Sequence, residues 1–317
     1  MESKKNAVHL TVSKCRKMPD IAVVLGVKYE ANHASVQKLK DSFSFDNLQS
    51  NNCLYTGAEY SALAYAIFML IKNKMVGSPL ELSRSKVSNI DCNVIGKKFL
   101  ITWNTQGSIS ALRKTIGLAL SSMNPHKLFS AYSVNIKNLG GKVDREVFNM
   151  VANKFASSIK ESIKIAVVGK INVEKSKLDE MLSKVISKLP KLSMEKGIKS
   201  PVKHEEFKHS FPSIKASGIA AAVVADYLKS QKYSLSVLGD EIIIYDNKFT
   251  SKQKSLSDAN RVKTFVKQKY EKLGDDLSCI FAYLCITQSL CDCCAVSSIV
   301  KSKVTPKDMI SYIKKSL

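Results

Sequence analysis

The chain has 317 residues, 45% of them hydrophobic, which is long enough for about two globular domains with a sizeable core. No window approaches the ~20 apolar residues of a membrane-spanning helix, and the amino terminus resembles neither a secretory signal nor a mitochondrial presequence. These features predict an intracellular soluble protein with no transmembrane segment, and they leave a virion or a mitochondrial location open.

The formal net charge of +22 predicts an acidic partner, which can be nucleic acid, an anionic membrane surface or an acidic protein. Lysine supplies most of this charge, since the only arginines are Arg16, Arg84, Arg113, Arg145 and Arg261. Arginine suits bidentate recognition of bases and phosphates, whereas lysine is common on solvated surfaces. Sequence-specific readout is therefore disfavoured, while non-specific attraction to a polyanion and simple solubility both fit.

The first half of the chain predicts alternating strands and helices. Hydrophobic alternation at Val8–Val12 and a β-branched run at Ile21–Tyr29 each predict a strand. The polar segment Glu30–Gly57 reads as a connection with a short helix near Ser35–Asp41, and the apolar segment Glu59–Lys74 predicts a helix buried on most faces. Next come the two strands of a tight hairpin, Lys86–Ile95 and Lys98–Asn104, which turns at Gly96 and Lys97. Three helices follow, at Ser108–Met123, His126–Lys137 and Val143–Glu161.

The segment Ile163–Pro190 is the clearest single element of the sequence. Its first residues are mostly β-branched and end at Gly169, which predicts a buried strand. Asn172 can cap the amphipathic helix that follows, and Pro190 stops that helix. A strand followed by an amphipathic helix is half of an α/β layer, so further strands must pack beside it.

The same order of elements recurs after a lysine-rich linker at 191–204. The predicted elements are a strand at Glu205–Lys215, a helix at Ala216–Ser230, a hairpin of Tyr233–Val237 and Glu241–Tyr245, and helices at Asp258–Leu273, at Asp275–Cys291 and from Thr305. A capping box of Thr305 and Asp308 marks the last helix. The predicted fold class is therefore α/β, an α+β roll of two similar mixed-sheet-plus-helices units, with domains at 1–190 and 205–317 joined by the linker.

Several segments together resemble the pitrilysin-type zinc peptidases, also called the insulinase or mitochondrial processing peptidase family. The segments are IAVVLGVKYE (Ile21–Glu30), KIAVVGKINVEKSKLDEMLSKVISKLP (Lys164–Pro190), ADYLKSQKYSLSV (Ala225–Val237) and SKVTPKDMISYIKKSL (Ser302–Leu317). The resemblance implies an α/β roll in each half and broad faces through which halves or chains pair.

The resemblance also implies where a peptidase site would lie. The family's chemistry needs a His-x-x-Glu-His helix, whose histidines bind zinc and whose glutamate activates water, and a distal glutamate as third ligand. The helix that should carry this motif, Glu59–Lys74, contains no histidine. The five histidines are His9, His33, His126, His204 and His209, and no two are four residues apart. We therefore predict a non-catalytic member with no catalytic, cofactor-binding or metal-binding residues.

Four weaker motifs have a plain structural interpretation that we favour over a functional one. His204 and His209 lie beside Glu205 and Glu206, where a solvated charge cluster is favoured over a zinc site. Gly169 and Lys170 lack the spacing of a phosphate-binding loop and fit a strand-to-helix turn. Cys291 and Cys294 have the gap of a zinc knuckle without a second pair, which favours packing and leaves metal binding open. The aromatic residues of the apolar helix, Tyr60, Tyr65 and Phe68, are predicted to be core rather than base-stacking side chains.

The leading prediction for function is a structural or scaffolding subunit of a larger assembly, in a virion or an organelle complex, that acts through contacts with protein subunits. The alternative is a protein that binds nucleic acid or another polyanion non-specifically through surface lysines. A third hypothesis is a zinc hydrolase with an unrecognised site. No cofactor is predicted.

Overall fold

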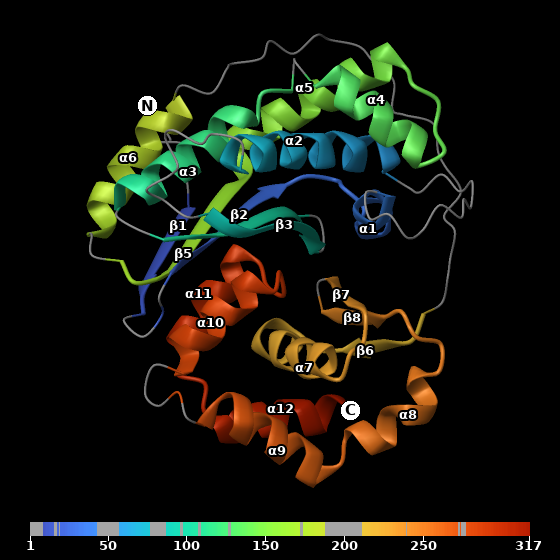
Figure 1. Ribbon diagram of the computed structural model, residues 1–317, viewed down its shortest axis with the longest axis vertical. Coiled ribbons are helices and arrows are strands. Elements are labelled where there is room, and N and C mark those ends of the chain that lie inside the picture. Colours follow the sequence, from blue (N-terminus) through green and yellow to red (C-terminus); the bar gives the residue numbers. More distant parts are fainter. Residues whose placement is uncertain are drawn as a thin grey trace, which may run out of the picture.

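The computed structural model shows two stacked units, each built of strands and helices (Figure 1). The described residues are 9–15, 18, 20–42, 57–76, 87–95, 98–106, 109–125, 128–171, 174–187, 211–238, 240–271, 273 and 277–317. The predicted turn at Gly96 and Lys97, the cap at Asn172, the stop at Pro190, the linker at 191–204 and the candidates His126, His204 and His209 lie outside these residues.

A five-stranded mixed sheet, here the first sheet, forms the centre of the first unit. Its strands are β1 (His9–Lys14), β2 (Ile21–Lys28), β3 (Val87–Ile95), β4 (Lys98–Thr105) and β5 (Ile163–Gly169). They lie in the order β1-β5-β2-β4-β3, and only the pair of β1 and β5 is parallel. The strand that opens the Ile163–Pro190 segment therefore lies inside the sheet, with a partner on each side.

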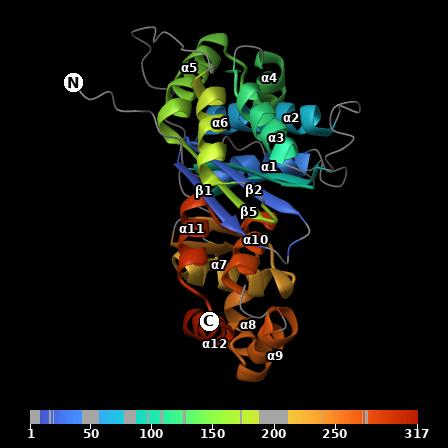
Figure 2. The same cartoon turned by 90° about the vertical axis from the view of Figure 1, so that its left-hand side faces the viewer.

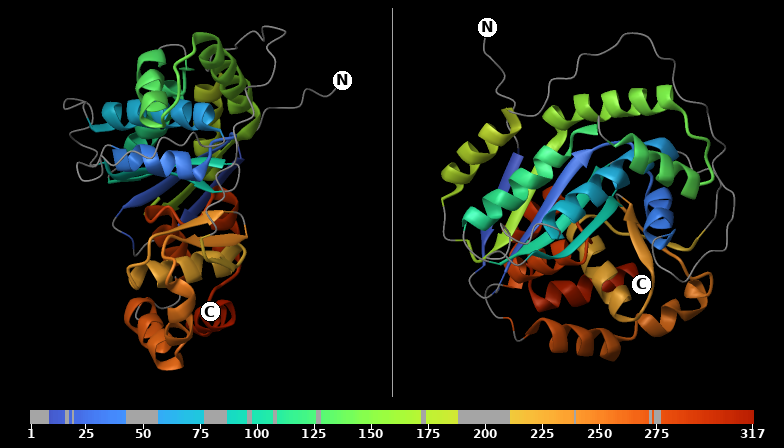
Figure 3. Two further views of the ribbon diagram at one scale, coloured as in Figure 1. Left: turned by 90° about the vertical axis from the view of Figure 1, so that its right-hand side faces the viewer. Right: turned by 45° about the horizontal axis from the view of Figure 1, so that its top comes forward.

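Helices of the first unit cover one face of this sheet (Figures 1 and 2). They are α1 (His33–Ser42), α2 (Ala58–Val76), α3 (Ile109–Ser122), α4 (Phe129–Asn138), α5 (Arg145–Ser162) and α6 (Lys175–Ser187). Figure 3 shows the blue-to-green helices lying across the strands. Among the described residues, no helix combines the length and the hydrophobicity that crossing a bilayer would need.

The strand β2 shows why the first sheet is buried on both faces. Val23 and Leu25 belong to the core under the first-unit helices, whereas Ala22 and Val24 belong to a second core on the opposite face. Successive side chains of a strand point to opposite faces, so an uninterrupted apolar run serves two cores at once. All four side chains have no solvent exposure.

The second unit repeats the pairing of the first sheet on a smaller scale. Its strands β6 (Ser213–Lys215), β7 (Leu235–Leu238) and β8 (Glu241–Ile244) are antiparallel and lie in the order β6-β8-β7, as β2, β4 and β3 do in the first sheet. Its helices are α7 (Gly218–Ser230), α8 (Phe249–Leu256), α9 (Ala259–Lys269), α10 (Leu277–Thr287), α11 (Cys293–Lys301) and α12 (Pro306–Ser316). The predicted fold class, with two similar units, is confirmed, while the domain boundaries stay predictions.

The two units share one apolar layer. The helices α10 and α11 of the second unit lie against the open face of the first sheet (Figure 1). The side chains that the first sheet contributes to this layer are Ala22, Val24, Ile95, Leu100, Ala166 and Val168. Separating the units would expose these side chains to water, at a cost of about 25 cal/mol for each Å² of apolar surface. We infer that the two units stabilise each other.

Gly26 in β2 is expected to control how closely α11 approaches the first sheet. A Cβ atom at Gly26 would lie 3.0 Å from Leu100 Cδ2 and 3.4 Å from Cys293 Sγ of α11. A Gly26→Val substitution should therefore overpack the shared layer and lower the free energy of unfolding by about 1–3 kcal/mol, measured by urea denaturation. The control is Gly117→Ala in α3, where a Cβ meets nothing within 4 Å and no loss is expected. Equal stabilities of the two variants would contradict this close approach.

Most predicted elements are found in the described residues, and the differences lie mainly in the second unit. Of the strand predicted at Glu205–Lys215, the described part begins only at Ser213. The helix predicted at Asp275–Cys291 is wrong at its carboxyl end, because α10 stops at Thr287 and Ser289 takes a left-handed conformation with φ of 54°. The sequence analysis missed α11, which begins where the Asp292 side chain accepts a hydrogen bond from the Ala295 amide. It also missed α8, because this short helix buries only Phe249 and Leu256 and has no apolar stripe.

Candidate functional site

The helix α2, where the resemblance places a peptidase motif, is built as a core element. The Ser61 hydroxyl donates to the Gly57 carbonyl at 2.9 Å and accepts a hydrogen bond from the Asn32 amide at 2.8 Å. The side-chain amide of Asn135, which lies on α4, donates to the Ala62 carbonyl at 2.9 Å. Side chains and backbone groups of the first unit therefore engage the first turns of α2. Among the described residues, no group of three or more His, Cys, Asp and Glu side chains is gathered as a metal site would be.

The aromatic side chains of α2 are core residues, as predicted. Tyr60, Tyr65 and Phe68 are 7%, 4% and 3% exposed. Tyr60 packs edge-on against Tyr29, and the Tyr29 hydroxyl donates to the Val151 carbonyl at 3.1 Å. A base cannot stack on rings that are buried to this extent.

The cysteines around α11 fall into two environments. Cys291 and Cys293 are buried, and the Cys293 thiol donates to the Lys164 carbonyl at 3.2 Å. Burial raises the pKa of the Cys293 thiol, so the thiol stays protonated at neutral pH and packs as a small hydrophobe. Cys294 is exposed, with its Sγ 3.3 Å from Lys164 Nζ, and Lys98 forms an ion pair with the cap residue Asp292. Cys291 and Cys294 thus do not share one environment, and metal binding by them stays an open prediction.

Gly169 and Lys170 form the strand-to-helix turn that the sequence predicts. Gly169 has a φ of +148°, and a Cβ there would lie 2.3 Å from the Asp20 carbonyl oxygen, so only glycine fits. The Ile171 amide donates to the Gly169 carbonyl at 2.9 Å, and α6 begins at Lys175. The need for glycine at position 169 is therefore explained by the backbone of Asp20, which passes too close to leave room for a side chain.

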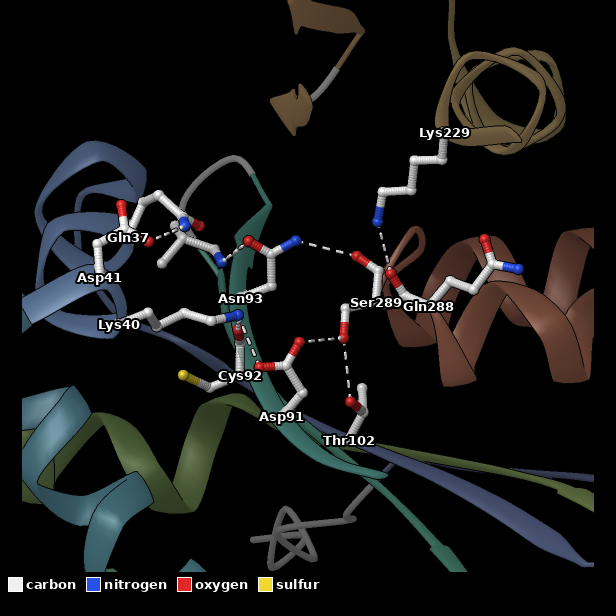
Figure 4. A network of polar contacts seen from close by, with 11 residues as sticks. Gln37, Lys40, Asp41, Asp91, Cys92, Asn93, Thr102, Lys229, Gln288 and Ser289 are labelled. Atoms are coloured by element: carbon white, nitrogen blue, oxygen red, sulfur yellow. Dashed lines mark hydrogen bonds and ion pairs between the residues drawn. The ribbon is translucent and has the colours of Figure 1, made fainter. Parts of the chain in front are cut away.

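A polar network of charged and hydroxyl side chains crosses the boundary between the two units. We call it the seam network (Figure 4). Lys40 of α1 pairs with Asp91 of β3 at 2.6 Å and donates to the Cys92 carbonyl at 3.0 Å. The Ser289 hydroxyl of the second unit lies 3.1 Å from that of Thr102 in β4 and donates to Asp91 at 3.4 Å.

Two further hydrogen bonds extend the seam network. The Asn93 side-chain amide donates to the Ser289 carbonyl at 2.9 Å, across the boundary. The Lys229 ammonium of α7 donates to the Gln288 carbonyl at 2.9 Å (Figure 4). Burial lowers the pKa of Lys229, with Asp91 acting in the opposite direction. The turn between α10 and α11 is thus held from both units.

His33, Ser236 and Tyr245 form a second buried cluster between the units. His33 starts α1, whereas the other two side chains come from β7 and the end of β8. Ser236 Oγ lies 2.8 Å from His33 Nε2 and 2.6 Å from the Tyr245 hydroxyl, which is 3.1 Å from His33 Nδ1. Burial, with the charge of Lys40 as a smaller cause, lowers the pKa of His33 to about 4. The imidazole is therefore neutral at pH 7.

The cluster has the residue types of a nucleophile and a base, yet its geometry fits a joint better than a catalytic site. Ser236 is 1% exposed and His33 is 7% exposed, so a substrate could reach them only if the units separated. A histidine that titrates near pH 4 is also a weak general base at neutral pH. A neutral imidazole offers one donor and one acceptor nitrogen, and the two hydroxyls can satisfy both.

Sequence analysis missed both clusters. Asp91 and Asn93 are polar residues within a strand, which is a signal that something polar packs on it. Nothing in the sequence indicates that the partners are Ser289, 196 positions from Asn93, and Ser236, 203 positions from His33.

The solved structures that resemble this chain in fold include peptidases. No known family model matches the chain, and no curated protein matches it. A protease from Helicobacter pylori shares 11% identity and has a TM-score of 0.49, with 98% of this chain and 94% of that chain covered. A peptidase M16 inactive domain from Pseudomonas fluorescens gives 11% identity and a TM-score of 0.42, covering 100% of this chain and 94% of the other. Pitrilysin gives 12% identity and a TM-score of 0.37, covering 98% of this chain and 41% of the other.

The structural neighbours are therefore insulinase- and pitrilysin-like peptidases, and they include an inactive domain. These are the family names to which the sequence resemblance points. With identities of 9–12% and TM-scores below 0.5, the likeness decides nothing about the activity of this chain. Its function has to be inferred from its own residues.

Proposed function

We propose that this chain is a non-catalytic, peptidase-like scaffolding subunit of a larger assembly and that it acts through contacts with other protein subunits. The observation that supports this proposal most directly is the composition of α2. The helix that should carry His-x-x-Glu-His has no histidine, and its first turns are tied to the surrounding chain through Ser61 and Asn135. A helix of this kind serves packing rather than zinc chemistry.

The boundary between the two units supports a role as a rigid platform. An apolar layer and two polar clusters join the units, and both clusters combine side chains from each unit. Buried polar groups that satisfy each other restrict the relative placement of the elements that carry them. The outer surfaces of the two units are thus presented in a fixed arrangement, as a scaffold requires.

The chemistry of the exposed surface indicates the kind of protein partner. Within the described residues, the large hydrophobic side chains that are clearly exposed are Val76 and Val134, at 69% and 48%. Two separated valines do not form an apolar docking patch. With a net charge of +22, the chain is suited to acidic subunits whose charge complements it. A virion or an organelle complex is the setting that we propose.

Cross-linking in the native source tests this proposal. We expect a tagged chain, expressed at its native level, to form cross-links with a fixed set of acidic proteins, and to form fewer of them when the salt concentration is raised before the cross-linker is added. Recovery of the chain only as a lone monomer would contradict a scaffolding role. Stoichiometric zinc in protein that was purified without chelator would contradict the non-catalytic part and favour a hydrolase.

A further inference from the structure

The end of the molecule that lies farthest from the first-unit helices carries a concentration of positive charge. The helices α8, α9 and α12 form this end (Figures 1 and 2), and α9 and α12 pack against each other. The sequences of α8 and α9 contain no acidic residue. We call the exposed basic side chains of α9 and α12 the basic end face, which consists of Arg261, Lys263, Lys267, Lys307, Lys314 and Lys315.

The apolar pattern of each helix turns these side chains outward. In α9, Val262 and Val266 are buried, and Lys263 and Lys267 are exposed. In α12, Met309 and Ile313 are buried. Residues three or four positions apart share a helix face. Met309 and Ile313 therefore face α7 and α9, against which α12 packs, and the exposed lysines of α12 lie on its other side.

Two of the carboxylates near the basic end face are engaged with helix ends. Asp258 accepts hydrogen bonds from the amides of Asn260 and Arg261 at 3.0 and 2.9 Å. Asp308 accepts one from the Thr305 amide at 2.9 Å, and its hydrogen bonds to Thr305 lower the pKa of its carboxyl. Among the described residues, no carboxylate forms an ion pair with a side chain of this face. The lysines are therefore available to an external anion.

The chemistry of the face selects among polyanions. Each helix has 11 residues and is about 16 Å long, a length over which a nucleic-acid duplex presents about ten phosphate charges. The exposed valines are on α2 and α4, so the described residues of this end do not include exposed large apolar side chains of the kind that anchor a helix in a membrane surface. Phe265 and Tyr270 of this region pack edge-on against each other rather than offering stacking platforms for single-stranded bases.

We propose that the basic end face binds the phosphate backbone of double-stranded nucleic acid without sequence preference. Five of its six side chains are lysines, which attract phosphates as point charges, and one is arginine. This inference is independent of the scaffolding role, because a scaffold can carry such a face or lack it.

A pair of charge-matched variants tests the proposal with fluorescein-labelled duplex DNA of 25 base pairs and fluorescence anisotropy. The face variant combines Lys263→Gln, Lys267→Gln, Lys307→Gln and Lys314→Gln. The control variant removes the same charge from exposed lysines of the first unit by Lys28→Gln, Lys114→Gln, Lys137→Gln and Lys142→Gln. Circular dichroism and thermal unfolding confirm that both variants are folded before binding is measured.

We expect the face variant to bind the duplex at least about tenfold more weakly than the control variant at 0.1 M salt. The unmodified chain should bind duplexes of different sequence equally, with a log–log salt slope of about −4 to −6. The slope of the face variant should be shallower by about 3 to 4 units, because each lost phosphate contact removes about 0.9. Equal weakening of both variants, a flat salt response, or binding to anionic phospholipid vesicles without binding to DNA would overturn the proposal.

Discussion

A Lys269→Met variant should lose about 3 kcal/mol of unfolding free energy at neutral pH, because it leaves the buried Asp226 carboxylate without its cation. Asp226 lies on α7 and is 2% exposed, and its Oδ1 atom accepts from Lys269 Nζ at 2.6 Å. Methionine keeps an apolar stem in place of that of Lys269, whose charged Nζ atom lies 5.6 Å from the ring centroids of Phe265 and Tyr270. The change therefore isolates the loss of charge, and urea denaturation measures it.

The pH dependence of this loss identifies its cause. Burial raises the pKa of Asp226, while Lys269 and Gln288 act in the opposite direction. Without Lys269, the folded-state pKa should rise further above the unfolded-state value, so the folded carboxyl holds its proton to higher pH. Stability is then lost as the pH rises through the folded-state pKa, and the deficit of the variant should be smaller at pH 5 than at pH 8.

Two matched variants separate a buried pair from ordinary packing. Lys252→Met removes the cation of an exposed pair with Asp246, 3.6 Å apart, and should cost less than about 1 kcal/mol. Adding Asp226→Leu to Lys269→Met removes both charges and should recover most of the loss. A deficit of Lys269→Met that does not change with pH, or that the second substitution leaves unchanged, would show that the lost charge is not its origin.

The sequence predicted most elements and their repeated order along the chain because both follow from short-range patterns. The β-branched run at Ile21–Tyr29, the uniformly apolar Glu59–Lys74 segment and the capping box at Thr305 each depend on residues that are close in the chain. The structure has β2, α2 and α12 at these places, with both hydrogen bonds of the capping box. The prediction of two similar units rests on the same patterns found twice, whereas the order of the strands within each sheet is seen only in the structure.

The boundary between the units could not be predicted, because it depends on pairs that are far apart in the chain. Gly26 in a central strand indicates a close approach, but not that Cys293 is the residue that approaches. His33 stands in the polar segment Glu30–Gly57, and nothing local shows that it is buried by Ser236 and Tyr245. Composition predicted a strongly basic protein, whereas the concentration of lysines on α9 and α12 requires the packing of these two helices.

Acidification should weaken the joint between the units through His33. The pKa of its imidazole is lowered from the model-peptide value of 6.5 to about 4, chiefly by burial. Between these two values the unfolded chain takes up a proton that the folded chain does not, so stability falls as the pH falls from 6.5 toward 4. At about 1.4 kcal/mol per pKa unit, the loss is on the order of 3 kcal/mol. The groups that face His33 are Lys40, Asn93, Lys229, Ser236 and Tyr245. The positive charges of both lysines oppose protonation of the imidazole.

A His33→Gln variant provides the comparison, since glutamine can hydrogen-bond to Ser236 but does not titrate. The variant is expected to start less stable at pH 7.5 and to lose less stability than the unmodified chain on acidification to pH 4.5. The fluorescence of Trp103, the only tryptophan of the chain and a fully buried core residue of the first unit, reports unfolding there. Circular dichroism at 222 nm follows the helices of both units.

The difference between the two chains is the informative quantity, because carboxylates elsewhere add the same pH dependence to both. Parallel stability curves from pH 7.5 to 4.5 would show that His33 is not the group that titrates. If the curves converge as expected, coincident transitions by tryptophan fluorescence and circular dichroism would show that the joint holds both units in one cooperative structure. An early circular-dichroism transition in the unmodified chain, before Trp103 responds, would instead mean that the second unit opens first and that the first unit stays folded without it.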